Sequence, residues 1–463
     1  MKRLLTVLFA WVGAVAAAGQ TPFEEAAFLQ SVLAHHPLAR QADLLDDAAA
    51  AYLRKARGAF DPKLMASDKS KSYGGTSYYG YQTAGIVAET PLGLTLESSW
   101  SQTDGAYLNP ESTLPDGGLW SVGATVRLGQ GLLTDARRTA LRQAEAYVQL
   151  NAAQRTLALN DLLFDAATDY WKWYKAHEAA EVAQEAERLA LIRLEGIRSA
   201  VSGGDRAAID TVEARLRWST RRMEAAAAAT ALAQARAKAS SWLWDDAGRP
   251  LALAESVAPV APTDWTAATV WVTLKLLIDR SRSARWQSHP LNDALAAKGS
   301  AADAQIRLAR EQLKPQLDAR FLALSPSSPL DLGPTDYALE LKAALPLFLR
   351  KERGDLELAR IDRENISLDL ENKARKWDAE AYGAGVAWAD YVRRWEAARE
   401  TEALAEALLE AEGVKFTAGE SSIFLINSRE AGLVKARKDR IEAEVEAAMA
   451  WRRMGWIWGE PQP

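Results

Sequence analysis

The sequence predicts a mainly α-helical protein with a strand-rich part, built as a tandem repeat of long antiparallel helical hairpins. The first observation is an echo: His-Pro-Leu at 36–38 recurs at 289–291. The second is the spacing of two further prolines, because Pro62 and Pro315 each lie 25 residues after the proline of their copy. The third is an offset of 215 residues that aligns 131–146 with 346–361. A repeat this long restricts the fold more than any single motif. The repeat-junction prolines are Pro37, Pro62, Pro290 and Pro315.

Composition supports long helices and excludes several classes of protein. Ala, Glu, Leu, Arg and Lys dominate 132–244 and 347–456, which is typical of coiled coils. The net charge of −5 comes from interspersed signs, so no basic surface for nucleic acid is expected. The chain has no cysteine and only 4 histidines, which form no spaced ligand set. Neither disulfides nor a metal site nor a cofactor is therefore expected.

The first residues predict a signal peptide at 1–18. Lys2 and Arg3 precede an apolar run that ends in small residues, and Ala16-x-Ala18 fits the cleavage rule. The alternative is an uncleaved membrane anchor, but the run is shorter than the ~20 apolar residues of a spanning helix. We therefore expect export.

Between 63 and 130 the sequence becomes rich in Gly, Ser, Thr and Tyr, and polar and apolar residues alternate. This period of two predicts strands. The matching segment of the second repeat, about 316–345, predicts two strands. The first repeat carries 38 extra residues, which form either a surface loop or a second hairpin of about 82–89 and 93–101. The turn signal Pro91-Leu92-Gly93 favours the hairpin.

Aromatic residues gather in these segments. Aromatics at strand ends suit the girdle where a β-barrel crosses the lipid headgroups. The alternative is a soluble sheet that uses aromatics for their β propensity. The candidate girdle residues are Tyr78, Tyr79, Tyr81, Trp100, Trp120 and Tyr337.

Each long helix is expected to end at a glycine turn, at 202–205 and at 418–421. Glycine suits the left-handed position after a helix, and Asp or Ser is expected to cap the returning helix. The domain organisation is a first repeat at 19–244, a linker at 245–288 that lies beside the hairpins, a second repeat at 289–456 and a tail at 457–463.

No catalytic arrangement is recognisable, so we expect no enzyme. The polar residues after the first glycine turn are the candidate exception. Asp210 and Glu213 are three residues apart and share a helix face near Arg206. They are either an ordinary exposed helix start or, with several copies around an axis, rings of charge that narrow a pore mouth.

The plan resembles the TolC family of outer membrane efflux proteins over nearly the whole mature chain. The motifs that carry the resemblance are FDPKL (60–64), RLGQGLLTDARRTALRQA (127–144), GGDRAAIDTVEAR (203–215), LKPQL (313–317), LPLFLRKERGDLELA (345–359) and AGESSIFLINSREAG (418–432). The resemblance implies a homotrimer whose strands form one shared β-barrel in the outer membrane lipid, with the helical part in the periplasm.

The resemblance further implies a passive duct for efflux or secretion, joined by a periplasmic adaptor and an inner membrane pump. Asp210 matches an acidic aperture position of the family. The family's gate after the second glycine is absent, because Ser421, Leu425 and Ser428 occupy its positions. The alternative function is a periplasmic coiled-coil adaptor or scaffold without a barrel. The implied docking residues at the tips are Gly203, Gly204, Asp205, Gly419, Glu420 and Ser421.

Overall fold

The structure, a computed structural model, describes residues 21–261, 282–329, 331 and 336–460. The expected signal peptide and much of the expected linker lie outside these residues. The chain divides into two compact units. One, here called the sheet unit, comprises 42–157 and 286–377, and the other, the hairpin unit, comprises 1–41, 158–285 and 378–463.

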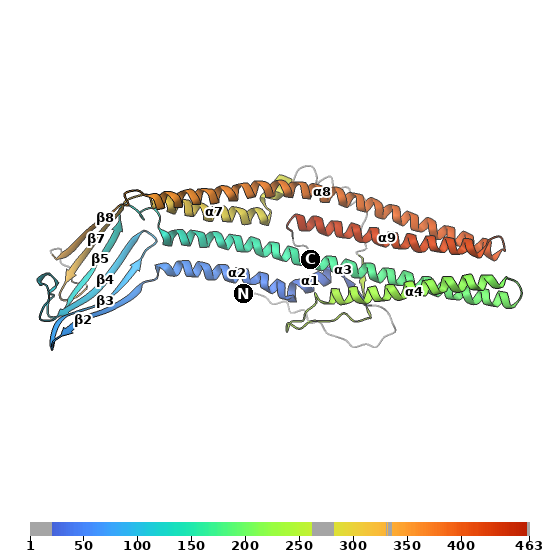
Figure 1. Cartoon of the computed structure of the whole chain (residues 1–463), viewed down its shortest axis with the longest axis horizontal. Helices are drawn as coiled ribbons and strands as arrows, with labels where there is room; N and C mark the ends of the chain where they lie inside the picture. The colour runs from blue at the N-terminus through green and yellow to red at the C-terminus, as the bar shows by residue number, and fades with distance from the viewer. Residues whose placement is uncertain (1–20, 262–281, 330, 332–335, 461–463) are drawn as a thin grey trace. The chain divides into compact units, whose positions relative to one another are not determined.

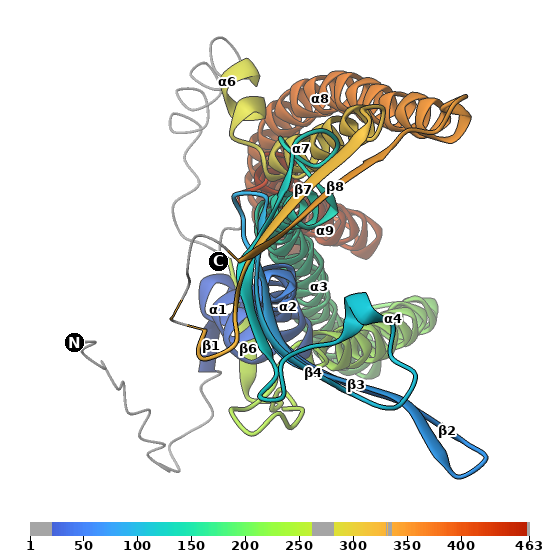
Figure 2. The same ribbon diagram turned by 90° about the vertical axis from the view of Figure 1, so that its left-hand side faces the viewer.

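The sheet unit contains an antiparallel sheet of six strands among the described residues. Figure 2 shows that the sheet is curved, with β2 and β8 at its two edges. The 38 extra residues of the first repeat include the hairpin β3–β4, as the turn signal at 91–93 indicated. In spatial order the strands are β2 (Lys63–Tyr73), β3 (Thr76–Glu89), β4 (Leu94–Asp104), β5 (Leu119–Arg127), β7 (Gln316–Ser325) and β8 (Tyr337–Ala344).

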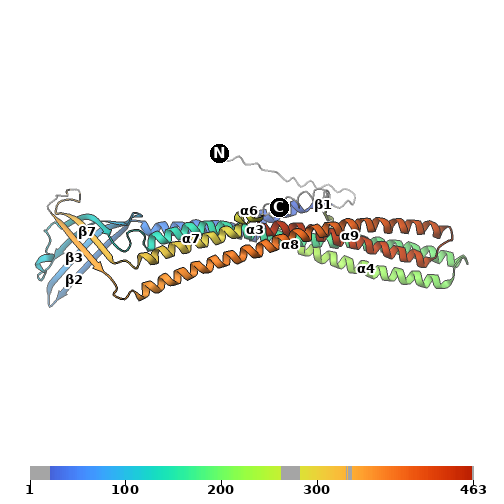
Figure 3. The same ribbon diagram turned by 90° about the horizontal axis from the view of Figure 1, so that it is seen from above.

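Helices lead into and out of these strands. Leu150 and Ala153 of α3 pack on Ala294 and Ala297 of α7, so the two helices lie side by side (Figure 3). Short 3-10 turns η1 (Gly58–Phe60) and η2 (Pro110–Ser112) complete the connections. The helices concerned are α2 (Pro37–Arg57), α3 (Ala136–Ser202), α7 (Pro290–Glu311) and α8 (Arg350–Thr417).

The repeated His-Pro-Leu sequence begins a helix in both repeats. Proline at the first helical position lacks the N–H that would have no partner there. The preceding histidine then accepts a hydrogen bond at Nδ1, over 3.2 Å from the Leu38 N–H and over 3.0 Å from the Leu291 N–H. Burial lowers the pKa of His36, which keeps its imidazole neutral and able to accept. Pro62 and Pro315 directly precede β2 and β7.

The hairpin unit contains the distal parts of α3 and α8 and the helices that return beside them. Figure 1 shows α4 (Ala208–Ser240) alongside α3 and α9 (Ile423–Ile457) alongside α8. Near the turns, Leu194, Ile197, Ala214 and Ile423 from three of these helices form one apolar cluster. The unit also holds α1 (Glu25–His35), and the boundary between the two units falls within the short α6 (Arg282–Gln287).

The core of the hairpin unit is aromatic. Tyr170 and Trp173 of α3 are fully buried, and the Tyr170 hydroxyl lies 2.8 Å from the carbonyl oxygens of both Phe23 and Val260. Those residues belong to a two-stranded parallel sheet of β1 (Thr21–Glu24) and β6 (Val257–Val260). Part of the expected linker therefore forms a strand, and Tyr170 fastens it to the long helix. No described helix is long and apolar enough to cross a membrane.

Candidate functional site: the helix tips and the two faces of the sheet

Both long helices end in the same backbone motif. Gly204 and Gly419 have φ values of +85° and +81°, which glycine adopts without strain. The Asp205 N–H donates to the Ala200 carbonyl and the Glu420 N–H to the Lys415 carbonyl, each over 2.9 Å. These are the six-to-one hydrogen bonds of the Schellman motif. The two tips are therefore equivalent in geometry.

The expected helix caps at the tips are wrong in detail. Helix α4 begins after Ala207, and no side chain caps it, so Asp205 is not a cap. Helix α9 is capped by Ser422, whose hydroxyl accepts from the Leu425 N–H. Ser421 instead donates its hydroxyl hydrogen to Glu412 of α8. Each turn is longer than the sequence signal suggested, because the chain needs extra residues to reverse direction before the next helix starts.

The candidate aperture residues make contacts within the hairpin unit. The Arg206 guanidinium lies 3.7 Å from Asp210 and 4.7 Å from the centre of the Phe416 ring on α8. Glu213 accepts a hydrogen bond of 3.4 Å from the Asn427 amide on α9. The acidic face of α4 is thus directed toward the second helical hairpin of the same chain.

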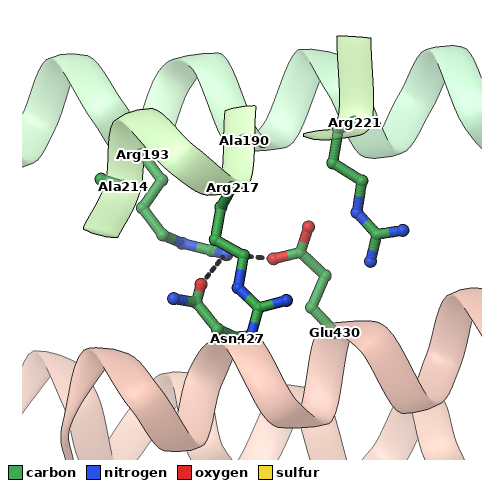
Figure 4. A pocket seen from close by; sticks show the side chains of 7 residues that line it. All are labelled: Ala190, Arg193, Ala214, Arg217, Arg221, Asn427 and Glu430. Atoms are coloured by element: carbon green, nitrogen blue, oxygen red, sulfur yellow. Dashed lines mark hydrogen bonds and ion pairs between the residues drawn. The ribbon is translucent and has the colours of Figure 1, made fainter. Parts of the chain in front are cut away.

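Asn427 belongs to a polar cluster that the sequence did not single out. Arg193 of α3 donates to the Asn427 side-chain oxygen over 3.1 Å and forms an ion pair with Glu430 of α9. Figure 4 shows Arg217 and Arg221 of α4 extending on either side of the Glu430 carboxylate. Helices α3 and α4 thus bring three arginines to line one small pocket with Glu430 of α9, where Arg193 is its ion-pair partner and Arg221 pairs with Glu224 at 2.7 Å. Asn427 and Glu430 are each 5% exposed.

A signal for this cluster is present in the sequence. Ile423, Ile426, Glu430 and Leu433 step by three and four residues, which is the spacing of a buried helical seam. A carboxylate in such a seam requires a cationic partner, since an unpaired buried charge is strongly unfavourable. Sequence patterns cannot identify that partner, because Arg193 lies in the other repeat.

One face of the sheet carries a continuous series of polar contacts, and we call it the polar face. Successive side chains of a strand point to opposite faces of the sheet, so the strand register shows which residues share a face. The Arg320 guanidinium binds both oxygens of Glu97 at 2.6 Å and lies 3.6 Å from Glu340. Ser99 and Ser121 are hydrogen-bonded at 2.7 Å on neighbouring strands, and Thr83 and Ser101 at 3.2 Å.

On the opposite face, called the apolar face, large apolar side chains are exposed. The polar residues that the register places there lie mainly toward the β2–β3 turn, where the Gln82 amide donates to Asp68 over 3.5 Å. Leu64 at one edge is 84% exposed and Leu341 at the other is 73% exposed. Exposed apolar patches of this kind mark a surface that meets another protein or a lipid. The apolar and aromatic residues that the register assigns to this face include Leu64, Ala66, Ala84, Ile86, Leu96, Trp100, Trp120, Val122, Ala124, Val126, Ala319, Phe321, Ala323, Tyr337, Leu339 and Leu341.

The candidate girdle residues divide between the two faces. Trp100 and Trp120 are register partners on the apolar face, and Tyr337 lies on that face beside Phe321. Tyr79 and Tyr81 share the polar face with Thr83. Tyr78 contacts Lys71 and Tyr107 beside the irregularity in β2–β3 pairing. Register, which depends on pairing between distant segments, decides this division.

The described residues hold no group of three or more His, Asp or Glu side chains arranged as metal ligands. That the functional site needs no metal remains an expectation from the sequence. What the arrangement provides is a pair of polar helix tips and a sheet with one apolar and one polar surface.

Comparison by sequence identifies no relatives: the chain matches no protein-family model and no curated protein. Comparison by structure does. The Campylobacter jejuni CmeC outer membrane channel matches 94% of this chain and 85% of its own, with a TM-score of 0.63 and 13% identity. The open state of the Neisseria gonorrhoeae MtrE outer membrane channel matches 95% and 89%, with a TM-score of 0.66 and 16% identity.

The outer membrane protein VceC from Vibrio cholerae matches 94% of this chain and 96% of its own, with a TM-score of 0.63 and 14% identity. These matches extend over both repeats, so they cover the helical hairpins and the strands together. The fold class expected from the TolC resemblance is confirmed: this chain has the fold of the outer membrane channels CmeC and MtrE.

Proposed function

We propose that this protein is the outer membrane channel of a tripartite efflux or secretion system. It acts as a passive duct in the outer membrane, with its helical part in the periplasm, and works with a periplasmic adaptor and an inner membrane pump. The observation that carries the proposal is the sheet, whose apolar face is exposed while its opposite face bears hydrogen-bonded and ion-paired side chains.

The two faces match the two environments of a membrane channel wall. Lipid requires apolar side chains, and a water-filled passage tolerates charged ones. Ile86, Leu96 and Phe321 are about half exposed on the apolar face, where a soluble protein would lose solubility. On the polar face, Arg320 is held between Glu97 and Glu340, which suits a surface in contact with water.

A homotrimer follows from the same proposal. Six strands cannot close into a barrel alone, since membrane barrels begin at eight strands. Folding and assembly of such a protein are expected to be inseparable, because the isolated copy leaves backbone groups without partners. The threefold number comes from the resemblance to the TolC family.

The helix tips are proposed as the docking surface for the adaptor or pump. Their backbone geometry supports this proposal, since the two glycine turns are equivalent and present exposed polar residues around Gly204 and Gly419. A partner with repeated contacts would meet both tips in the same conformation.

Arg206, Asp210 and Glu213 are proposed to control the aperture at the tips. Because Arg206 contacts Phe416 and Glu213 contacts Asn427, these residues also join the two hairpins that would have to separate. We expect Asp210→Ala combined with Glu213→Ala to raise the open probability or leak of the trimer in a planar bilayer. Glu185→Ala, which removes an exposed carboxylate paired only along α3 with Arg188, is the control. A bilayer trace equal to that of the unchanged protein would remove both carboxylates from the gate.

The adaptor alternative gains no support from the comparisons, which include outer membrane channels and extend over the strands as well as the helices. A soluble adaptor would also leave the exposed apolar face without a role. No catalytic group is needed for the proposed function.

Cell fractionation followed by native mass measurement tests the proposal. We expect the protein in the outer membrane fraction, and after detergent extraction we expect a mass of three protomers, each somewhat below the 50.6 kDa of the full chain. A soluble monomer or dimer would contradict the channel and favour the adaptor.

A further inference from the structure

The two edge strands of the sheet present an unsatisfied backbone. Among the described residues, neither β2 nor β8 pairs with a strand on its outer side. Neither strand contains a proline, and the pairing irregularity in β2 lies at its far end, between Lys71 and Ser72. Most of each edge is therefore a regular row of N–H and C=O groups that can accept another strand.

The apolar face reaches both edges of the sheet. Leu64 and Ala66 lie on it in β2, and Leu339 and Leu341 lie on it in β8. Soluble proteins protect an exposed edge with charges that point toward the partner side. On β2 the one charged residue of the apolar face is Asp68, which accepts a hydrogen bond from Gln82, while Lys69 and Lys71 lie on the polar face beside Tyr79 and Tyr78.

In lipid such edges must be covered, since an unpaired backbone N–H or C=O group is strongly unfavourable there. The strand directions show which partner fits. All neighbouring strands are antiparallel, so an even number of described strands makes β2 and β8 run in opposite directions. The β8 edge of one copy can thus pair with the β2 edge of another copy in the same antiparallel pattern that the sheet already has.

Charge on the polar face is complementary across the same two edges. Glu340 on β8 is exposed and has Arg320 at 3.6 Å on its inner side, which leaves its outer side open. Lys63, Lys69 and Lys71 share the polar face of β2. Opposite charges on facing strands stabilise pairing, whereas like charges oppose it.

From these observations we infer that β2 of one copy pairs with β8 of the next, so that three copies of six strands close an eighteen-stranded barrel. This inference rests on the proposed function and adds the seam and the strand number to it. The apolar face of one copy must continue as the apolar face of the next copy across the seam. Even-numbered residues of β2 therefore lie opposite odd-numbered residues of β8. The occupant of each free edge is therefore a second copy of this chain.

The hairpin β3–β4 accounts for the width of this barrel. Without it each copy would supply four strands, and three copies would close twelve. Barrel diameter grows roughly in proportion to strand number, so eighteen strands give a passage about 1.5 times as wide. Barrels of ~16–18 strands enclose a water-filled channel.

Cysteine cross-linking tests the seam, and the chain is suited to it because it has no cysteine of its own. Ser67→Cys on β2 is combined in turn with Ala338→Cys, Glu340→Cys and Lys342→Cys, which lie on the same face. The opposite-face controls combine it with Leu339→Cys or Leu341→Cys. Paired residues on neighbouring strands have Cβ atoms about 4.5–5.5 Å apart, within reach of oxidation or a short cross-linker.

We expect at least one same-face pair to give covalent dimers and trimers on a denaturing gel, ending at three chains. The opposite-face pairs should remain monomeric. A further control, Ser67→Cys with Ser121→Cys on β5, should not cross-link, since two strands lie between them at ~4.8 Å per strand. An intramolecular cross-link in that control would show that β3–β4 leaves the barrel and would overturn the strand number.

The outcomes separate this inference from the proposed function. A trimer in the outer membrane without any same-face cross-link would overturn the seam while the channel stands. Cross-linked products longer than three chains would overturn the closed ring. A protein absent from the outer membrane would contradict the channel itself.

Discussion

On the proposed channel function, Ile86→Arg should greatly reduce assembly of the protein in the outer membrane. Ile86 lies on the apolar face of β3, a strand paired on both sides, and is 47% exposed. An arginine facing lipid costs about 2–4 kcal/mol at the bilayer midplane and less toward the interfaces, and this cost applies to every copy in the assembly. The amount of folded oligomer in outer membrane fractions, measured by semi-native gel electrophoresis, is the appropriate readout.

Val87→Arg is the matched control for this substitution. Val87 is the next residue of the same strand, and its register partner is Glu97 on the polar face. An arginine there meets water and a carboxylate, so assembly should be close to that of the unchanged protein. Equal loss of assembly in both variants would contradict the assignment of the two faces.

Glu430→Ala should strongly destabilise the hairpin unit. Glu430 is 5% exposed, pairs with Arg193 and lies between Arg217 and Arg221. Its removal leaves Arg193 without its ion-pair partner beside two further arginines. Breaking a buried ion pair by removing one partner costs about 3–5 kcal/mol. Since Arg193 is 25% exposed, we expect a loss near the lower end of that range in the free energy of unfolding, measured as a shift of the urea midpoint.

Two further variants show whether the shift in urea midpoint comes from the buried ion pair. Glu185→Ala removes an exposed carboxylate that pairs with Arg188 on α3, where the change in urea midpoint should be small because exposed ion pairs contribute little. Arg193→Met combined with Glu430→Leu replaces the ion pair by apolar contact and should recover much of the lost stability. If Glu430→Ala cost no more than Glu185→Ala, the cluster would not hold the hairpins together.

The sequence predicted those parts of the fold that depend on neighbouring residues. Gly204 and Gly419 were identified because a helix that ends in a left-handed residue favours glycine, and the structure has positive φ at both. Pro37 and Pro290 were identified as helix starts for an equally local reason, and α2 and α7 begin at them. The helix lengths followed from the absence of proline.

Prediction was weaker wherever two distant segments meet. The capping residue of α9 is Ser422 and not Ser421, a difference set by the path of the turn. The candidate aperture was chosen from the spacing of Asp210 and Glu213, yet the partner of Glu213 is Asn427 of the other repeat. No pattern within one helix indicates which residue of another helix it will contact.

The sequence by itself determined a repeated plan of helices, strands and glycine turns, since proline, glycine and alternation act through the local backbone. The tertiary structure alone decided that β3–β4 joins the sheet, that Tyr81 and Trp100 lie on opposite faces, and that Arg193 meets Glu430. The physical reason is that strand register and helix packing are set by contacts between residues far apart in the chain, which a linear pattern does not specify.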